Sequence, residues 1–120
     1  MNIPANLKYT KTHEWVKDLG NGLFEIGLSD YAQKELGDIV FVNLPQPGDA
    51  ITAGQPFADL ESVKAVSDIN SGVTGTVKEV NETLSSAPDS INKAPYETWI
   101  IRAEGSLGTV MSAADYEKTL

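Results

Sequence analysis

The chain contains no cysteine and only one histidine, His13. Without a thiol it can form no disulfide, has no thiolate nucleophile, and offers no sulfur ligand for zinc or for an iron–sulfur cluster. A zinc-protease helix beginning at His13 and Glu14 would need its second histidine at Lys17, so we predict neither a metal site nor zinc hydrolysis. Any redox or sulfur chemistry must therefore be brought in by an attached group.

Basic residues and long apolar runs are also scarce. Nine Lys and Arg stand against seventeen Asp and Glu, which gives a formal net charge of −8. An acidic surface repels phosphate backbones and anionic lipids, so we expect neither nucleic acid nor a membrane as a partner. No run is long and apolar enough to span a bilayer, and the N-terminus lacks a signal-peptide core. We expect a cytoplasmic protein of bacterial type, although a mature mitochondrial form would look the same.

Motifs for nucleotide chemistry are missing as well. The chain has no Gly-rich loop ending in Gly-Lys-Ser/Thr and no strand-linked Gly-x-Gly-x-x-Gly. Paired acids such as Asp59 and Glu61 have the chemistry of a general acid and base. Alternate residues of a strand share one face, however, and a solvated acidic face is the better interpretation. We therefore predict no catalytic residue.

The length and the turn signals predict one mainly β domain. A chain of 120 residues with 41% hydrophobic content fits a single domain, residues 1–120. Many short extended segments, cut by turn residues, favour a small β-sandwich or flattened barrel. The expected strands are 14–19, 23–28, 39–43, 57–62, 65–69, 75–80 and 98–103.

Helices are expected only at the periphery of this sandwich. Ser29 can cap a short helix that ends at Gly37, because glycine readily adopts the left-handed C′ conformation. Ser112 can open a last helix, with Asp115 three residues later in a capping-box arrangement. A turn of helix is also expected near 88–92.

The most informative segment is the run from Glu61 to Asp68. It places Lys64 between small and apolar neighbours, with acids at both ends. On this pattern alone, Lys64 is an ordinary lysine that points from a strand into water. If it lies at the tip of a tight hairpin, its amine becomes a candidate for carrying a cofactor.

Other motifs of the chain decide between these interpretations. They are His13 to Val16, Ile26 to Gln33, Leu36 to Pro45, Glu61 to Ala65, Val80 to Glu82, and Pro95 with Tyr96. In this order and at these spacings, the chain closely resembles the H protein of the glycine cleavage system, from about Leu7 to Leu120. The resemblance implies a lipoyl/biotinyl-domain-like β-sandwich, a barrel-sandwich hybrid, with short peripheral helices and a C-terminal helix.

The resemblance also implies a cofactor and its site. Lipoate would be joined by an amide to Lys64, in a lipoyl hairpin near 61–68. The residues that would present the lysine to a lipoylating enzyme are Glu61, Ser62, Val63 and Ala65. A cleft beside the hairpin would protect the loaded arm, and the matching positions here are Thr12, Glu14 and Asp68.

By the same resemblance, the chain is a carrier that catalyses no step. Its arm would accept an aminomethyl group from a pyridoxal-phosphate-dependent glycine decarboxylase and pass it to a tetrahydrofolate-dependent aminomethyltransferase. A flavin dihydrolipoyl dehydrogenase would reoxidise the arm, and a lipoate ligase or an octanoyltransferase would take part in lipoylation. The carrier is expected to be a monomer.

The chain departs from the family pattern at a few places. Thr12 stands where related sequences often carry serine, which keeps the hydroxyl and adds a methyl group. Ser71 to Gly75 replaces a proline-containing turn, and the segment from Pro95 to Trp99 is one residue short. The latter two changes could alter docking to partners, but neither touches Lys64.

Three alternatives remain open on the sequence. An H-like relay protein would donate lipoate to 2-oxoacid dehydrogenase complexes, and the sequence does not separate this role from glycine cleavage. A lipoyl domain of such a dehydrogenase would lack the His13 to Val16 motif and the terminal helix. A biotinyl carrier would carry Met on both sides of its lysine, where this chain has Val63 and Ala65.

Overall fold

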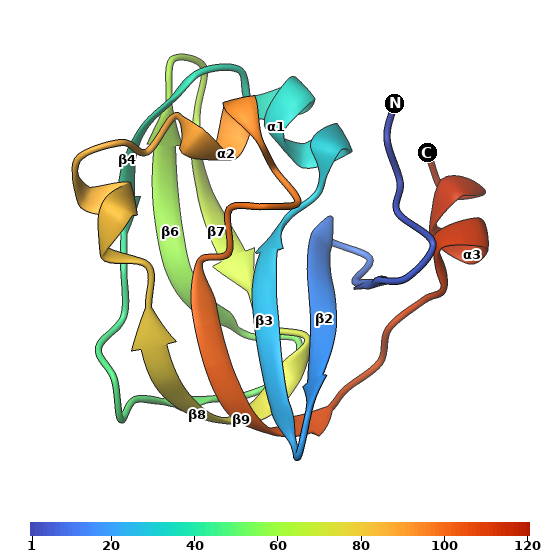
Figure 1. The fold of residues 1–120 in the computed structure, drawn as a ribbon. Helices are drawn as coiled ribbons and strands as arrows, with labels where there is room; N and C mark the ends of the chain where they lie inside the picture. The colour runs from blue at the N-terminus through green and yellow to red at the C-terminus, as the bar shows by residue number, and fades with distance from the viewer.

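The computed structural model describes residues 1–120 and consists of two antiparallel sheets with a hydrophobic core between them (Figure 1). The larger sheet has the strand order β1-β2-β3-β9-β8-β5, and the smaller has the order β4-β6-β7. The predicted mainly β sandwich is therefore confirmed, with both sheets open at their edges. The strands are β1 (Lys8–Tyr9), β2 (Glu14–Gly20), β3 (Leu23–Leu28), β4 (Ile39–Asn43), β5 (Ala50–Ile51), β6 (Pro56–Ser62), β7 (Val66–Asn70), β8 (Val73–Val80) and β9 (Ile101–Leu107).

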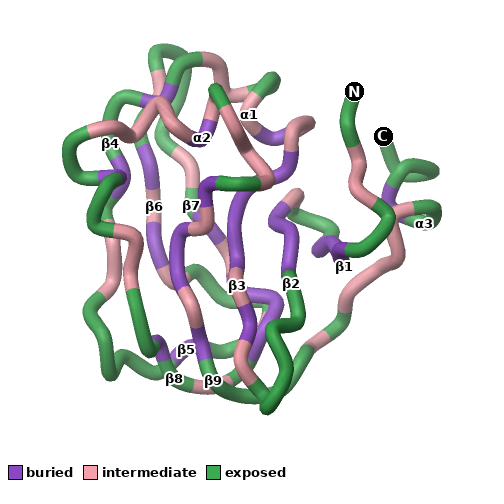
Figure 2. Tube along the Cα trace, viewed as in Figure 1, coloured by how far each residue is buried: buried purple, intermediate pink, exposed green.

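The core forms where the inner faces of the two sheets meet (Figure 2). Along β6, Ala58 and Leu60 are buried, whereas Asp59 between them is half-buried and Glu61 is exposed. Ala58 lies opposite the fully buried Ile69 of β7, so apolar side chains of paired strands point to the same side. This alternation fixes the register of the strands, because a shift by one residue would expose the apolar side chains to water.

The helices begin and end close to the predicted positions. Helix α1 (Asp30–Leu36) starts at Ser29, whose Oγ accepts a hydrogen bond from Ala32 N at 3.2 Å, and it ends at Gly37 with φ 72°. Helix α3 (Ala113–Glu117) starts at Ser112, whose Oγ accepts from Asp115 N at 3.2 Å. The turn of helix expected near 88–92 is α2 (Ser90–Lys93), and it is preceded by an unpredicted 3-10 turn, η1 (Glu82–Ser85).

The strand predicted at 98–103 lies later in the chain, as β9. Thr98 N donates to Ala94 O at 3.0 Å, so the chain from Ala94 to Thr98 forms a turn and not a strand. Pairing to the neighbouring strand begins where Ile100 N donates to Ile26 O at 2.8 Å. At the other end, Gly105 faces Gly75 across the ladder, where a Cβ would lie 2.0 Å from Thr74 O. Glycine at this position lets β8 and β9 approach closely and extends β9 beyond the predicted end.

The two ends of the chain come together in a second, aromatic cluster (Figure 1). The rings of Tyr9 and Tyr116 stack with centroids 4.6 Å apart and an interplanar angle of 2°. The Tyr116 hydroxyl lies 2.8 Å from Nδ1 of His13 and 2.8 Å from Oγ of Ser29. Helix α3 is thereby tied to the segment before β2 and to the start of α1, which are both walls of the site described next.

Candidate functional site

Lys64 lies at the exposed tip of the β6–β7 hairpin, next to Gly37 at the end of α1. Figure 1 shows this hairpin tip beside α1. Ser62 N donates to Ala65 O at 2.8 Å and closes the turn. The Ser62 hydroxyl accepts hydrogen bonds from Lys64 N and Ala65 N, each at 3.1 Å. A serine hydroxyl that accepts hydrogen bonds from two backbone amides later in the turn restricts the conformation of that turn, because these amides would otherwise bond to water. The amine of Lys64 takes part in none of the ion pairs.

The tip is anchored to the loop that joins α1 to β4. Val63 N donates to Asp38 O at 3.0 Å. Gly37 packs directly under the tip, since a Cβ there would lie 3.4 Å from both Val63 Cγ2 and Lys64 Cε. Its φ of 72° and this close approach both favour glycine. The stem of Lys64 thus starts over the end of α1.

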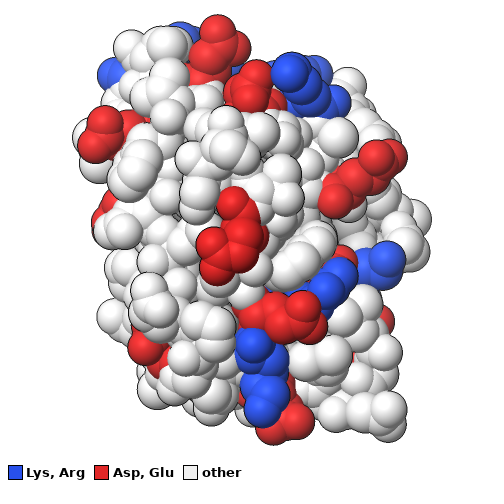
Figure 3. Space-filling view, turned by 60° about the vertical axis from the view of Figure 1, so that its left-hand side comes forward, with Lys and Arg blue, Asp and Glu red and all other residues white.

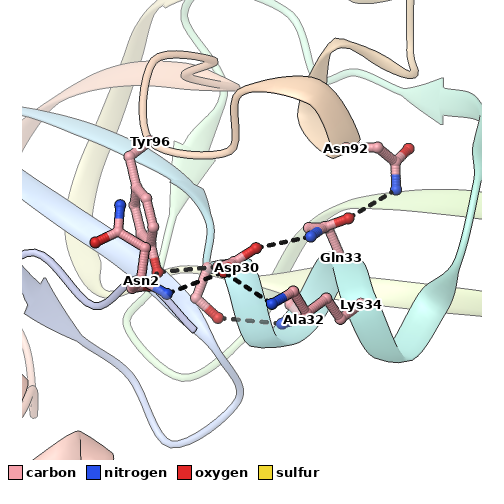
Figure 4. Close-up of polar contacts among 8 residues, drawn as sticks. Asn2, Asp30, Ala32, Gln33, Lys34, Asn92 and Tyr96 are labelled. Atoms are coloured by element: carbon pink, nitrogen blue, oxygen red, sulfur yellow. Dashed lines mark hydrogen bonds and ion pairs between the residues drawn. The ribbon is translucent and has the colours of Figure 1, made fainter.

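A side chain from α2 holds this loop in place. Asn92 Nδ2 donates to Gly37 O at 2.9 Å and to Gln33 Oε1 at 3.1 Å, and Asn92 Oδ1 accepts from Ile39 N at 2.9 Å. Figure 4 shows that the chain of hydrogen bonds continues beyond Gln33. Its Nε2 donates to Oδ1 of Asp30 at the other end of α1. Sequence reasoning missed Asn92, because nothing in its local pattern indicates a bond to a loop more than fifty residues away.

A cleft of about 280 Å³ lies between α1, the segment before β2, and β7. The structure brings the three predicted cleft residues, Thr12, Glu14 and Asp68, to its lining. The sequence analysis missed the polar members His13, Tyr31, Glu35 and Ser67. The remaining lining is apolar and consists of Leu28, Ala32, Leu36 and Leu60. The cleft therefore combines an apolar floor with several carboxylates.

Glu14 is the buried carboxylate of this cleft, with 1% of its surface exposed. Its Oε1 accepts hydrogen bonds from the hydroxyls of Thr10 and Thr12, the latter at 2.5 Å, and its Oε2 accepts from Asn70 N at 3.2 Å. Burial raises the pKa of Glu14, and these hydrogen bonds oppose the rise. A carboxylate has about four lone-pair positions. Three donors leave room for one more on Oε2, where a cation would also offset the cost of burying the charge.

His13 forms part of the wall next to Glu14. Its backbone has a φ of 76°, which is rare for a residue with a side chain. Its ring lies against Tyr31 with centroids 4.6 Å apart. Burial lowers the pKa of His13, and the nearby carboxylate of Glu35 opposes this effect. Burial raises the pKa of Tyr116 to about 12, so the hydroxyl that contacts His13 stays protonated at neutral pH.

The outer face of the small sheet is acidic and partly apolar. Asp59 and Asp68 lie directly opposite each other, and Glu61 lies between Phe41 and Val66 in the ladder. Phe41 and Val66 are 51% and 73% exposed. On the face seen in Figure 3, acidic side chains lie scattered between uncharged ones, and no broad basic patch is present.

Fold and site together define a mainly β protein that presents one lysine on a hairpin tip beside an acidic cleft. The family model for the glycine cleavage H-protein matches residues 7–120. The chain belongs to this family.

Curated relatives and a solved structure agree with this assignment. A glycine cleavage system H protein of Lachnoclostridium phytofermentans is 55% identical over 102 residues, covering 85% of this chain and 80% of the relative. One from Listeria monocytogenes is 48% identical and covers 100% of this chain and 99% of the relative. The crystal structure of a glycine cleavage system H protein from Mycobacterium marinum has a TM-score of 0.91 at 31% identity, over 98% of both chains. None of the helices has the length and apolar character needed to cross a bilayer.

Proposed function

We propose that this chain is the lipoyl carrier protein of the glycine cleavage system, with lipoate attached by an amide to Lys64. The observation that carries the proposal is the tip itself. The lysine amine is exposed and unpaired, while Ser62, Asp38 and Gly37 hold the backbone beneath it. A lipoylating enzyme, a lipoate ligase or an octanoyltransferase, needs an amine that is accessible and presented in one geometry.

The residues around Lys64 fit recognition by such an enzyme. Ser62 and Ala65 are small and leave the lysine accessible, and Val63 is 66% exposed next to it. Glu61 is exposed and supplies a charge. Lipoate on Lys64 would supply a disulfide able to take up the aminomethyl group that remains when the pyridoxal-phosphate enzyme releases the carboxyl group of glycine as carbon dioxide. The loaded arm would then be a substrate of the tetrahydrofolate enzyme, and the reduced arm a substrate of the flavin enzyme.

The cleft fits the protection of an amine cargo. An amine bound through one carbon to sulfur is lost to water when its nitrogen lone pair is free, and protonation removes this lone pair. Glu14 can accept a hydrogen bond from the ammonium on Oε2, with Thr12 and Asp68 beside it. A carboxylate raises the pKa of a nearby ammonium, and the apolar floor limits the access of water. On this proposal, the chain binds and shields its cargo but catalyses no step.

Residues 1–120 act as one carrier domain, and the protein works as a monomer in the cytoplasm. Its meetings with the three enzymes of the system are transient, because a shuttling arm must leave each of them. The acidic outer face near the tip is suited to partners with basic surfaces.

The decisive experiment replaces Lys64 by arginine, which keeps the charge. Lys64→Arg should fold normally, take no label from a lipoate ligase, and fail in glycine–bicarbonate exchange with the reconstituted system. Lys78→Arg, another exposed lysine, is the matched control and should be labelled like the natural chain. Intact mass followed by peptide mapping reads both the modification and its position. Lipoylation that persists in Lys64→Arg would refute the assignment.

A further inference from the structure

The hairpin tip that carries Lys64 is held by its backbone and not by its side chains. The residues from Val63 to Val66 are all exposed, so burial does not fix their position. Beyond the strand ladders and the bonds within the turn, a backbone hydrogen bond joins the tip to the loop after α1, from Val63 N to Asp38 O at 3.0 Å. The position of the Lys64 backbone therefore depends on where the Asp38 carbonyl points.

The Asp38 carbonyl belongs to a peptide group that Asn92 binds from its opposite side. This group contains the carbonyl of Asp38 and the N–H of Ile39, which point in opposite directions in a planar trans peptide. Ile39 N donates to Asn92 Oδ1 at 2.9 Å, while the carbonyl accepts from Val63 N. Because the group is planar, the bond to Asn92 sets the direction of the carbonyl that holds the tip.

Asn92 binds the preceding peptide group of the loop as well. Its Nδ2 donates to Gly37 O at 2.9 Å and, through its second N–H, to Gln33 Oε1 at 3.1 Å. Gln33 is in turn held by Asp30 (Figure 4). Both donors and the acceptor of the Asn92 amide are thus in use, and a turned amide would place a donor against the N–H of Ile39. The amide therefore has one orientation, and it fixes two successive peptide groups beneath the tip.

We propose that Asn92 is a positioning residue for lipoylation, which acts through the Asp38–Ile39 peptide group to hold Lys64 where a lipoylating enzyme takes its amine. This inference rests on the proposed function and adds to it a residue on a different element from the lysine. Without the Asn92 amide, the peptide group can rotate and the tip takes up several positions, of which the enzyme binds a fraction. The KM for the carrier then rises by the inverse of that fraction, while kcat stays the same.

Lipoylation kinetics of the unmodified carrier test the role of Asn92. A lipoate ligase forms an acyl adenylate from lipoate and ATP with release of pyrophosphate. The neutral Lys64 amine attacks its carbonyl, so that the new C–N bond replaces the bond to AMP and one proton is released. Asn92→Ala should raise the KM for the carrier about fivefold, as expected for the loss of a hydrogen bond, and leave kcat within about twofold. Asn81→Ala is the matched control and should change neither, since Asn81 is also half-buried and bridges two backbone groups, Thr83 N and Trp99 O, outside the loop.

The outcomes separate the role of Asn92 from the assignment of Lys64. An unchanged KM in folded Asn92→Ala would overturn the positioning role alone. A lower melting temperature with an unchanged KM would likewise overturn it, because Asn92 would then support only the fold. A natural chain that takes no lipoate at Lys64 would overturn the proposed function instead.

Amide exchange of the unmodified chain follows the same link without any enzyme. In Asn92→Ala the Val63 amide should exchange about fivefold faster relative to the buried Ser71 amide, which donates to Gln55 O at 2.9 Å, whereas Asn81→Ala should leave this ratio unchanged. In the natural chain, the Val63 amide should exchange at least about fivefold more slowly than in an unstructured peptide, although its residue is 66% exposed. Exchange at the unstructured rate would overturn the proposal even if Asn92→Ala does not fold.

Discussion

Replacing Glu14 by alanine should shorten the lifetime of the aminomethyl-loaded arm without preventing lipoylation. Glu14 is 1% exposed and keeps one acceptor position after binding Thr10, Thr12 and Asn70. An ammonium held by a buried carboxylate gains about 1 to 3 kcal/mol relative to water. This gain corresponds to about 5- to 150-fold in favour of the protonated, unreactive amine. The loaded arm of Glu14→Ala should decay faster by a factor in this range.

The assay follows decay with no acceptor enzyme present. Natural and variant proteins are lipoylated and loaded with glycine and the decarboxylase, that enzyme is removed, and release of ammonia or formaldehyde is recorded without the aminomethyltransferase. Asp68→Ala should also decay faster, whereas Glu104→Ala, an exposed acid on β9, serves as the matched control. Thermal melting of each variant shows whether the fold survives. Equal decay in Glu14→Ala, Asp68→Ala and the natural chain would refute the role of the cleft.

Three further outcomes are expected. Lipoylation of Lys64 should shift the melting temperature by no more than about one to two degrees, since changes at exposed tips usually alter stability by less than about 0.5 kcal/mol, and calorimetry checks this. Gly27→Ala should lower the urea midpoint, at a cost of about 1 to 3 kcal/mol, because a Cβ there would lie 2.5 Å from the Trp15 ring, and an unchanged midpoint would contradict this packing. The raised pKa of Glu14 means that its contribution to stability is greatest below its ordinary pKa of about 4.3 and falls as pH rises through the folded value. Urea titrations should therefore show the natural chain gaining on Glu14→Ala as pH falls from neutral, and a constant difference would exclude the shift.

Local features of the fold could be predicted from the sequence, because they depend on neighbouring residues. Ser29 and Gly37 cap α1 through contacts within one helical turn, and the hairpin between β2 and β3 follows from glycines next to alternating strands. The start of β9 was misplaced, since the pairing of Ile100 with Ile26 depends on a segment far away in the chain. Tertiary contacts, and not local propensity, decide such boundaries.

The candidate site shows the same division. The resemblance supplied Thr12, Glu14 and Asp68, and the structure brings them to one cleft, while their role stays a prediction. His13 and Glu35 were missed, although His13 adjoins Glu14 in the sequence. His13 reaches the cleft through an unusual backbone conformation. Its ring also contacts Tyr116, more than a hundred residues away in the chain. No local pattern predicts such a contact.

The fixed base of Lys64 has a consequence for how the arm searches its surroundings. Because Asp38 and Gly37 immobilise the pivot, an arm of about 14 Å sweeps a half-sphere of roughly 6,000 Å³, which corresponds to an effective concentration on the order of 0.3 M. A cleft with an intrinsic dissociation constant of only about 30 mM would then be occupied about nine-tenths of the time. An enzyme that binds at the tip would need to supply only about 1.4 kcal/mol to make the cleft-bound and released forms of the arm equally populated. Tethering of this kind lets weak contacts shelter the cargo and still release it on contact with the next enzyme.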